Sequence, residues 1–491
     1  MAKVLTKIIV SNTVSKIENL NDKISALISS KLTFKATNYW FYESFKNGSW
    51  DGNIRFFNRI NDSFATGLLP KVVETLEENN INYSIIDIRK NKIQPSMLDK
   101  SFSFKTDKKL REYQEESVKN VLINKVGNIS FIRGIINAAT NAGKTVISEA
   151  IIHQILPLLK DEQKILFLTH SKEIAYQAKE NIEKDLGITV GIIGDGLWDE
   201  KTVTVALIPT LHRNHKKKQF KQLSNSVVAF VADETHRASG ESWIAVIKKL
   251  DGAFIRIGLT GTIPDDDVKK HQLFSLVGTP ITKISNDFLI NSGFSATPIC
   301  YFIEINNVNL NKLDYTDAYE LGVVDNEYRN KAIVNIVKKE VKAGKNILVL
   351  VERINHGEIL LNMLKKSGIK KVDFMYGSKY NSSRQDDRKA VLKSFKDSEI
   401  QVLIASSILE EGIDVEKINV IIYAKGMKSS RKLLQSIGRG LRKKDDGSML
   451  VFYDFLDYTC EYLCKHTLQR YEIMEKEKFK IQKLDPSEII H

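Results

Sequence analysis

From about residue 108 onward, short apolar runs alternate with amphipathic stretches along the chain. The run KILFLTH at 164–170 precedes a helical pattern at 171–186, and SVVAFVADE at 226–234 precedes another helical segment. Runs of β-branched and aromatic residues predict buried strands, and strands that alternate with helices predict parallel sheets. A second series extends from NILVLVER at 346–353 to MLVFYDF at 449–455. The pattern therefore predicts two tandem α/β lobes.

Other patterns occur at the ends of the chain and between the lobes. The first hundred residues contain the strand-like runs VLTKIIVSN and NIRFFNR, a helix candidate, LLPKVVETLEENN, and a further strand, YSIIDIRK, which together predict a small α+β domain. Residues 279–330 look like an irregular linker, and the charged C-terminal segment favours a helix. We expect an accessory domain at 1–95, a first lobe at 96–297, a second lobe at 298–465 and a charged helical tail at 466–491.

Size and charge narrow the classes of function. The chain has 491 residues, of which 42% are hydrophobic and 27% charged, as is ordinary for a soluble multidomain protein. Its formal net charge is +13. An excess of Lys and Arg favours an acidic polymer such as nucleic acid as partner, although charge alone does not separate such proteins from other basic ones.

Neither a disulfide framework nor a zinc site is predicted. The three cysteines, Cys300, Cys460 and Cys464, are too few for either and are interpreted as packing residues, and no metal-ligand set surrounds His356. Charges interrupt the N-terminal segment too early for a signal peptide, and no apolar run is long enough to span a bilayer. We expect a cytoplasmic protein without a membrane partner.

The segment IINAATNAGKTVISEA at 135–150 has the form of a phosphate-binding loop, because a strand precedes it and a helix follows it. Backbone N–H groups of the loop can hold a phosphate, while Lys144 reaches its oxygens and the Thr145 hydroxyl ligates Mg²⁺. The leading glycine of the usual pattern is Ala138 here, so the match is imperfect. Taken alone, Lys144 could be a surface lysine at the start of a helix.

A second strand ends in two adjacent carboxylates. Asp233 and Glu234 follow SVVAFVA and precede Thr235 and His236. Asp233 can ligate Mg²⁺ and Glu234 can orient the attacking water, at a strand end where α/β sheets bind ligands. The carboxylates could instead cap a helix, and a lone histidine is more often structural. Their combination with Lys144 favours the catalytic interpretation.

These segments resemble motifs I and II of the DExH branch of the superfamily 2 helicases. Other segments resemble the remaining motifs in the same order: LREYQ at 110–114 the Q motif, 164–177 motif Ia, LTGT at 259–262 motif III, 346–360 motif IV, 402–415 motif V and QSIGRGLR at 435–442 motif VI. Motif V departs slightly from familiar forms at EEGID, 410–414. The resemblance covers roughly residues 108–460.

The resemblance implies two tandem RecA-like lobes, with parallel sheets flanked by helices, that use ATP and Mg²⁺. The catalytic residues that it implies are Lys144, Asp233, Glu234, Gln435, Arg439 and Arg442, the two arginines acting as arginine fingers. The nucleotide-binding residues that it implies are Arg111, Gln114, Thr140, Asn141, Ala142, Gly143, Lys144, Thr145, Gly412 and Asp414, with Thr145 and Asp233 as the Mg²⁺ ligands. His236 would couple the ATP site to the DNA site. The nucleic acid is expected along Thr169, His170, Thr210, Thr260, Thr262 and Ser406.

The N-terminal segment resembles one particular group of superfamily 2 helicases. The motif NGSWDG at 47–52, the aromatic run YWFY at 39–42 and LLP at 68–70 resemble the N-terminal domain of the phage UvsW-type helicases, and the whole chain resembles that family and its relatives in T5-like phages. This implies a monomeric helicase of phage recombination, repair and replication in the host cytoplasm. Its partner would be branched DNA, or duplex DNA with single-stranded regions, and also RNA in RNA–DNA hybrids.

Further DNA contacts are expected at Lys46, Trp50, Arg55, Lys216 and Lys217. The tryptophans could equally form the core of the small domain, and the basic run at 215–218 could be a solvated loop. Three other functions stay open: an RNA-directed DExH helicase, a motor subunit of a restriction system, and a binding module with an inactive ATP site. The presence of every catalytic group argues against the last, and we find no segment with room for a nuclease.

Overall fold

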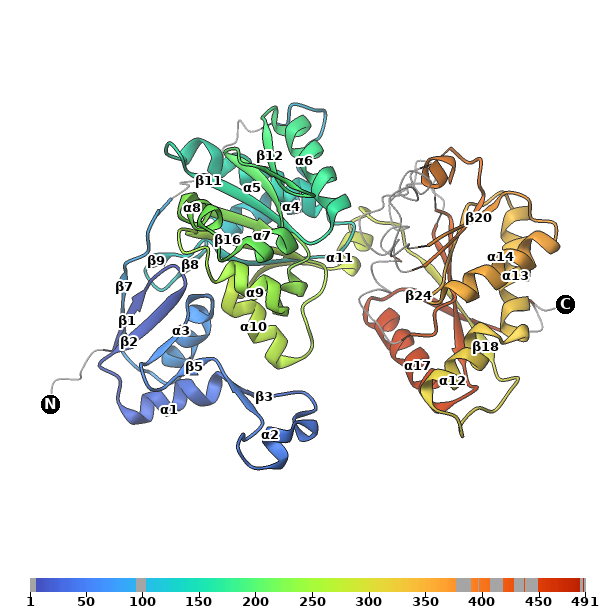
Figure 1. Ribbon diagram of the computed structural model, residues 1–491, viewed down its shortest axis with the longest axis horizontal. Coiled ribbons are helices and arrows are strands. Elements are labelled where there is room, and N and C mark those ends of the chain that lie inside the picture. The colour runs from blue at the N-terminus through green and yellow to red at the C-terminus, as the bar shows by residue number, and fades with distance from the viewer. Residues whose placement is uncertain are drawn as a thin grey trace. The chain divides into compact units, whose positions relative to one another are not determined.

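The computed structural model describes residues 6–93, 103–376, 390–395, 397–406, 418–427, 437, 449–485 and 489. The chain divides into two compact units, Met1–Ile284 and Ser285–His491. Each unit contains a large sheet of mainly parallel strands flanked by helices (Figure 1). Among the described residues, no helix is long and apolar enough to cross a membrane.

The first unit begins with a small α+β domain, as predicted. Its sheet has the order β5-β6-β2-β1-β7, in which β7 is parallel to β1 and the other pairs are antiparallel. Helices α1 and α3 pack against each other beside this sheet. The elements are β1 (Thr6–Val10), β2 (Val14–Glu18), α1 (Asp22–Lys31), β5 (Phe57–Asn58), β6 (Ser63–Ala65), η2 (Thr66–Leu68), α3 (Leu69–Glu78) and β7 (Tyr83–Asp87).

Between α1 and β5 the chain leaves this sheet and forms a separate arm, residues 33–56. Two short antiparallel strands form its base, and a 3₁₀ turn and a one-turn helix lie between them. These elements are β3 (Thr33–Lys35), η1 (Tyr39–Phe41), α2 (Glu43–Lys46) and β4 (Asn53–Arg55).

The rest of the first unit is an eight-stranded sheet with the order β13-β12-β14-β11-β15-β16-β10-β17. All pairs are parallel except β12 with β13. Every residue of β14, β15 and β16 is buried, as expected for parallel strands that helices cover on both faces. The strands are β10 (Arg133–Ala138), β11 (Lys164–Thr169), β12 (Val190–Gly194), β13 (Leu197–Asp199), β14 (Val203–Leu207), β15 (Val227–Ala232), β16 (Ile255–Thr260) and β17 (Pro280–Ile284).

The helices of this lobe pack in two groups. Helix α5 lies between α4 and α6, whereas α7 packs on α9 (Figure 1). The helices are α4 (Glu112–Leu122), α5 (Lys144–Ile155), α6 (Lys172–Leu186), α7 (Ile208–Asn214), α8 (Lys218–Ser226), α9 (Glu241–Ile247) and α10 (Asp267–Val277), with 3₁₀ turns η3 (Leu156–Leu158) and η4 (Thr235–Ser239) and a small hairpin of β8 (Lys125–Val126) and β9 (Ile129–Ser130).

Buried polar contacts attach the N-terminal domain to this lobe. The guanidinium of Arg133, which is 2% exposed, donates to the carbonyl oxygens of Asn12 at 2.9 Å and Leu276 at 3.1 Å. The side chain of Asn12 donates in turn to the carbonyl oxygen of Asp251 at 2.9 Å. Close packing accompanies these bonds, because a Cβ atom on Gly67 would lie 2.1 Å from the carbonyl oxygen of Phe274. Buried backbone carbonyls need donors, so these bonds constrain the position of the domain.

The second unit contains a seven-stranded, fully parallel sheet with the order β20-β21-β19-β22-β23-β18-β24. The strands are β18 (Ile299–Ile305), β19 (Ile347–Leu350), β20 (Val372–Met375), β21 (Val402–Ala405), β22 (Val420–Tyr423), β23 (Val451–Asp457) and β24 (Lys480–Leu484). The helices are α11 (Asn286–Asn291), α12 (Tyr315–Tyr319), α13 (Glu327–Lys342), α14 (Ile354–Lys366) and α17 (Glu461–Lys476), with a π turn η5 (Glu320–Val324). The prediction of two α/β lobes and a small α+β domain is confirmed.

Two local expectations were wrong. Residues 279–330 are not an irregular linker, because they contain β17, α11, β18 and α12. The tail is helical only to Lys476, after which β24 pairs in parallel with β18 at the edge of the sheet. The charged sequence KIQKL suits an edge strand, where one face and one side of the strand meet water.

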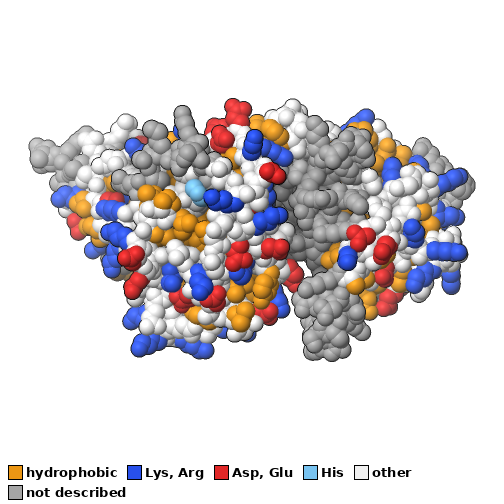
Figure 2. All heavy atoms as spheres, turned by 90° about the horizontal axis from the view of Figure 1, so that it is seen from above, with side chains coloured by type: hydrophobic (Ala, Val, Ile, Leu, Met, Phe, Trp, Pro, Cys, Tyr) orange, Lys and Arg blue, Asp and Glu red, His pale blue; other side chains and the backbone are white. Residues whose placement is uncertain are grey.

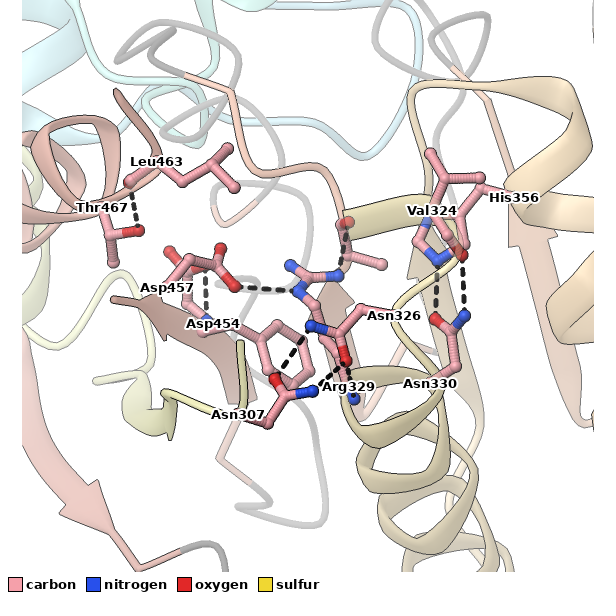
Figure 3. A network of polar contacts seen from close by, with 12 residues as sticks. Asn307, Val324, Asn326, Arg329, Asn330, His356, Asp454, Asp457, Leu463 and Thr467 are labelled. Atoms are coloured by element: carbon pink, nitrogen blue, oxygen red, sulfur yellow. Dashed lines mark hydrogen bonds and ion pairs between the residues drawn. The ribbon is translucent and has the colours of Figure 1, made fainter. Parts of the chain in front are cut away.

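A buried polar network holds the second unit together. Arg329 of α13, which is fully buried, donates to Asp457 at 3.1 Å and to the carbonyl oxygen of Ala424 at 3.0 Å (Figure 3). His356 of α14 contacts the Asn330 side chain at 2.9 Å in the same region (Figure 3). Burial lowers the pKa of His356 to about 3, and the charge of Arg329 acts in the same direction, so the imidazole is neutral.

A second buried arginine, Arg470 of α17, donates to the two carboxylate oxygens of Asp454 at 2.7 and 2.9 Å and to the carbonyl oxygen of Met427 at 2.9 Å. We predict that Arg470→Met lowers the free energy of unfolding by about 3–5 kcal/mol, because it leaves the buried carboxylate of Asp454 without its cation. Urea denaturation would measure the loss. Lys465→Met, an exposed site on the same helix, is the control, and equal stabilities of the two variants would contradict the prediction.

Glu149 on α5 is fully buried beside Asp185. Burial raises its pKa to about 8 even though Lys108 acts to lower it. The folded chain thus keeps a proton that the unfolded chain loses near pH 4.5, so stability falls as the pH rises from about 5 to 8. We predict that Glu149→Gln stabilises the protein by on the order of 2–4 kcal/mol at pH 8 and by little at pH 5. Denaturation at both pH values would measure this, with exposed Glu180→Gln as control; a pH-independent difference would contradict it.

Candidate nucleotide site and nucleic-acid interface

Four neighbouring parallel strands, in the order β11-β15-β16-β10, end at one edge of the first sheet. The predicted motif Ia begins in β11, motif II follows β15, motif III begins in β16 and the phosphate loop follows β10. Because parallel strands bring their carboxyl ends to the same edge, motifs far apart in the sequence meet there. This edge is the candidate nucleotide site.

The phosphate loop begins after Ala138 and ends at Gly143, which precedes α5. Gly143 has φ +76°, in the left-handed region, and a Cβ atom there would lie 2.4 Å from the Nε2 atom of Gln114. Glycine is therefore required both for this backbone conformation and for the space beside Gln114. The loop delivers the N-terminus of α5 to the site, where free backbone N–H groups favour an anion.

The Q segment holds this loop from the side. The Gln114 side chain, 3% exposed, donates to the carbonyl oxygen of Ala142 at 2.9 Å and accepts from the backbone N–H of Arg111 at 2.9 Å. The hydroxyl of Tyr113 donates to the same Ala142 oxygen at 3.1 Å. Gln114 thus positions the loop in this structure, and its contact with adenine stays a prediction.

Lys144 lies at the start of α5, with its Nζ atom 3.4 Å from the carbonyl oxygen of Ala138. Thr140, earlier in the loop, and Thr145, the residue after Lys144, are exposed, and Asn141 is half-buried. The loop therefore presents a cation and two accessible hydroxyl groups, which suit phosphate oxygens and a hydrated Mg²⁺.

The two carboxylates of motif II differ in environment. Burial raises the pKa of Asp233, and the charge of the adjacent Glu234 raises it further, against the effect of Lys144. Burial also acts to raise the pKa of Glu234, but Lys144 and His236 outweigh it and lower the pKa below the ordinary value. Glu234 is therefore the carboxylate that stays ionised, as a group that orients water must. Among the described residues, Lys144 is the cation whose charge lowers the pKa of Asp233, and this buried carboxylate fits a divalent metal ion.

His236 connects motif II with motif III. Its Nδ1 atom lies 3.0 Å from Glu234 Oε2 and 3.3 Å from the hydroxyl oxygen of Thr260. The Thr260 hydroxyl donates to the carbonyl oxygen of Thr262 at 2.8 Å. Since the histidine ring is only 5% exposed, these contacts are sheltered from water. A change in the position or charge of Glu234 can therefore be transmitted to Thr260 of motif III through the imidazole ring of His236.

Two residues that the sequence did not single out also build the site. Besides Tyr113, Asn137 contributes, because its side-chain amide, assigned with the nitrogen toward motif III so that it can donate, lies 3.3 Å from the carbonyl oxygen of Thr260 and 3.2 Å from that of Gly261. The signal for Asn137 was a polar residue in the otherwise apolar end of β10, and the signal for Tyr113 was its place beside Gln114 in the Q segment.

The residues expected along the nucleic acid have mixed exposure. Thr169, Thr260, Thr210 and Ser406 are buried, so any contact through their side chains requires a rearrangement. Thr262 is half-buried, whereas His170, Lys216 and Lys217 are exposed. These roles stay predictions.

In the arm, the expected cations already have acidic partners. Lys46 lies 3.5 Å from Glu43, and Arg55 forms a bidentate pair with Asp51. Trp50 is half-buried, with its indole N–H donating to the carbonyl oxygen of Asn53 at 2.9 Å, so it packs within the arm. Gly412, Asp414, Gln435, Arg439 and Arg442 lie outside the described residues.

The sequence of this chain matches two protein-family models. Residues 107–265 match the family model described as the res subunit of type III restriction enzymes, and residues 328–444 match the helicase conserved C-terminal domain. The ATP-dependent DNA helicase uvsW of Enterobacteria phage T4 is 23% identical over 492 residues, covering 91% of this chain and 92% of the relative. The chain belongs to the superfamily 2 family of ATP-dependent DNA helicases and translocases. Within that family it is similar to the UvsW helicase along nearly its whole length, as the sequence predicted.

Two further comparisons agree with this family. The DNA 3'-5' translocase XPB2 of Sulfurisphaera tokodaii is 26% identical over 443 residues, covering 81% of this chain and 95% of the relative. The structure of S. cerevisiae Dbp5 bound to RNA and ADP BeF3 superimposes with a TM-score of 0.53 at 15% identity, covering 77% of this chain and 93% of that one. Likeness at this level concerns the fold, that of tandem helicase lobes. The nucleotide of this helicase family is ATP.

The His236 contacts generate a prediction about the rate of ATP hydrolysis. His236→Ala removes the ring that lies 3.0 Å from the Glu234 carboxylate and contacts Thr260, while Lys144 still lowers the pKa of Glu234. We expect kcat to fall by roughly tenfold or more, since Glu234 loses its orienting partner. Steady-state ATP hydrolysis would measure the loss. His215→Ala, outside these contacts, is the control, and an unchanged kcat would contradict the assignment.

Proposed function

We propose that this helicase acts on branched DNA, in branch migration, fork regression and the unwinding of R-loops or D-loops. The observation that carries the proposal is the similarity to the phage T4 helicase along 91% of this chain, which includes the N-terminal domain as well as the motor. Recombination, repair and replication of phage DNA in the host cytoplasm would be its setting, with the protein acting as a monomer.

In the proposed ATP site, different residues would bind the phosphates, hold Mg²⁺ and orient the attacking water. The loop from Ala138 to Gly143 and the N-terminus of α5 would bind the phosphates, and Lys144 would neutralise their charge. Thr145 and Asp233 would hold Mg²⁺, and Glu234 would orient the attacking water. The bound Mg²⁺–ATP supplies the phosphoryl group whose transfer to water drives the cycle.

The remaining roles complete the proposal. Gln114 and Arg111 would contact the base, while Gly412, Asp414, Gln435, Arg439 and Arg442 would supply the groups of the second lobe. On the face drawn in Figure 2, the Lys and Arg side chains of the described residues are scattered among acidic and apolar ones.

The test is ATP hydrolysis with five additions: no nucleic acid, single-stranded DNA, duplex DNA, a four-way junction and RNA. We expect the strongest stimulation from the junction, because it offers both duplex and unpaired segments. Lys144→Ala should lower the rate of ATP hydrolysis by at least about 100-fold, because it removes the cation that neutralises the phosphates. DNA binding should persist. Lys184→Ala, at an exposed lysine of α6, is the matched control.

Each other outcome has a definite meaning. Strongest stimulation by RNA would replace the proposal with an RNA-directed helicase. Turnover at the wild-type rate in Lys144→Ala would refute the site itself.

A further inference from the structure

The residues that lead into the Q segment, 104–109, belong to no helix or strand. Their backbone groups therefore lack the regular partners that helices and sheets supply. The Q segment itself holds the phosphate loop, through the bonds of Tyr113 and Gln114 to the carbonyl oxygen of Ala142. The contacts that fix residues 104–109 therefore contribute to the position of the loop.

One buried residue, Asp185 in the last turn of α6, makes three hydrogen bonds with these residues. Its carbonyl oxygen accepts from the backbone N–H of Lys105 at 2.8 Å. Its carboxylate accepts from the Thr106 hydroxyl at 2.8 Å and, on the other oxygen, from the ammonium of Lys108. Close packing accompanies these bonds, because a Cβ atom on Gly187, which has φ +66°, would lie 3.1 Å from Cγ of Lys105. We call this set of contacts the Asp185 anchor.

The environment of Asp185 suits a carboxylate only when these partners are present. The side chain is fully buried, and it lies at the C-terminal end of a helix, where the carbonyl groups carry partial negative charge. Burial acts to raise the pKa of Asp185, but the hydrogen bonds from Lys108 and Thr106 outweigh it and lower the pKa below its ordinary value. The neighbouring Glu149 of α5 keeps its proton at neutral pH, so Asp185 carries the charge that holds the segment.

The anchor lies where parts of the candidate ATP site converge. Asp185 belongs to α6, which packs against α5, the helix that begins with Lys144. Lys108 lies three residues before Arg111, whose backbone N–H donates to the Gln114 side chain. Loss of the anchor would therefore release the N-terminal end of the Q segment, while the groups of the phosphate loop and of motif II would keep their own contacts.

We propose that Asp185 is a positioning residue for ATP binding, which holds the segment before the Q segment through Thr106 and Lys108 and so keeps Gln114 against the phosphate loop. This inference rests on the ATP site of the proposed function and adds three residues that lie outside the helicase motifs. A loop that is binding-competent in only a fraction of the molecules binds its ligand more weakly by the inverse of that fraction. The anchor therefore sets the affinity for ATP, whereas the hydrolysis of bound ATP depends on the groups of the phosphate loop and motif II.

The test compares nucleotide affinity with turnover. Thr106→Val/Lys108→Met removes the hydroxyl and the ammonium from the anchor at half-buried and exposed positions, and urea denaturation checks that the fold persists. Titration with the fluorescent analogue mant-ATP should give a dissociation constant about three- to tenfold above that of the wild type, as expected for the loss of hydrogen bonds to a charged group. The KM for ATP should rise by the same factor, with kcat unchanged within about twofold. Lys109→Met, which removes an exposed cation from the same segment, is the matched control.

A variant on the helix side separates the anchor from a general loss of stability. Asp185→Asn keeps the shape of the side chain but removes its charge, and it should also raise the dissociation constant for mant-ATP. Added to Thr106→Val/Lys108→Met, it should cause little further loss of affinity, because changes to groups that act as a unit are not additive.

Three results would overturn the inference: a dissociation constant for mant-ATP equal to that of the wild type, a fall in kcat with unchanged affinity, or additive losses in the combined variant. Failure of the proposed function is distinguishable, because the titration with mant-ATP requires neither DNA nor turnover. If no nucleic acid stimulates hydrolysis by the wild type, the proposed function fails, whereas the anchor is judged by the measured affinities.

Discussion

The parallel pairing of β11, β15, β16 and β10 is the constraint on which the rest of the first unit depends. Apart from Arg133 and Arg256, these strands are mainly apolar and almost wholly buried, so the polar groups open to a ligand lie where the strands end. Parallel direction then brings those ends to one edge of the sheet, where the phosphate loop, the two carboxylates and motif III meet. The contacts of His236 with Glu234 and Thr260 exist because of this arrangement.

Buried arginines connect segments that the sheets alone would leave independent. Arg133 joins β10 to the carbonyl of Asn12 in the N-terminal domain, and Arg329 joins α13 to the ends of β22 and β23. A guanidinium has five donors in a rigid fork, and burying it without partners costs several kcal/mol. Each buried arginine is thus compatible with few arrangements of its neighbours, which favours one packing over competing ones.

The N-terminal domain is part of the motor's structure as well as a carrier of surface residues. It forms one compact unit with the first lobe, through Asn12, the close approach at Gly67 and the stacking of Phe34 on His271. The last contact reaches α10, which follows motif III. A group on the arm therefore keeps its place relative to the ATP site of that lobe, which a domain on a flexible linker would not do.

The sequence by itself determined the class of fold and predicted which residues belong to the candidate ATP site. Both follow from local patterns, which can be recognised in the sequence alone. These are the alternation of apolar runs with amphipathic stretches, and motifs such as GKT at 143–145 and DETH at 233–236. Only the tertiary structure decided that Gln114 holds the phosphate loop, that KIQKL pairs as an edge strand, and that Trp50 is packed while Trp40 and Phe41 are exposed. The physical reason is that burial and hydrogen-bond partners depend on residues far away in the sequence, which no local pattern contains.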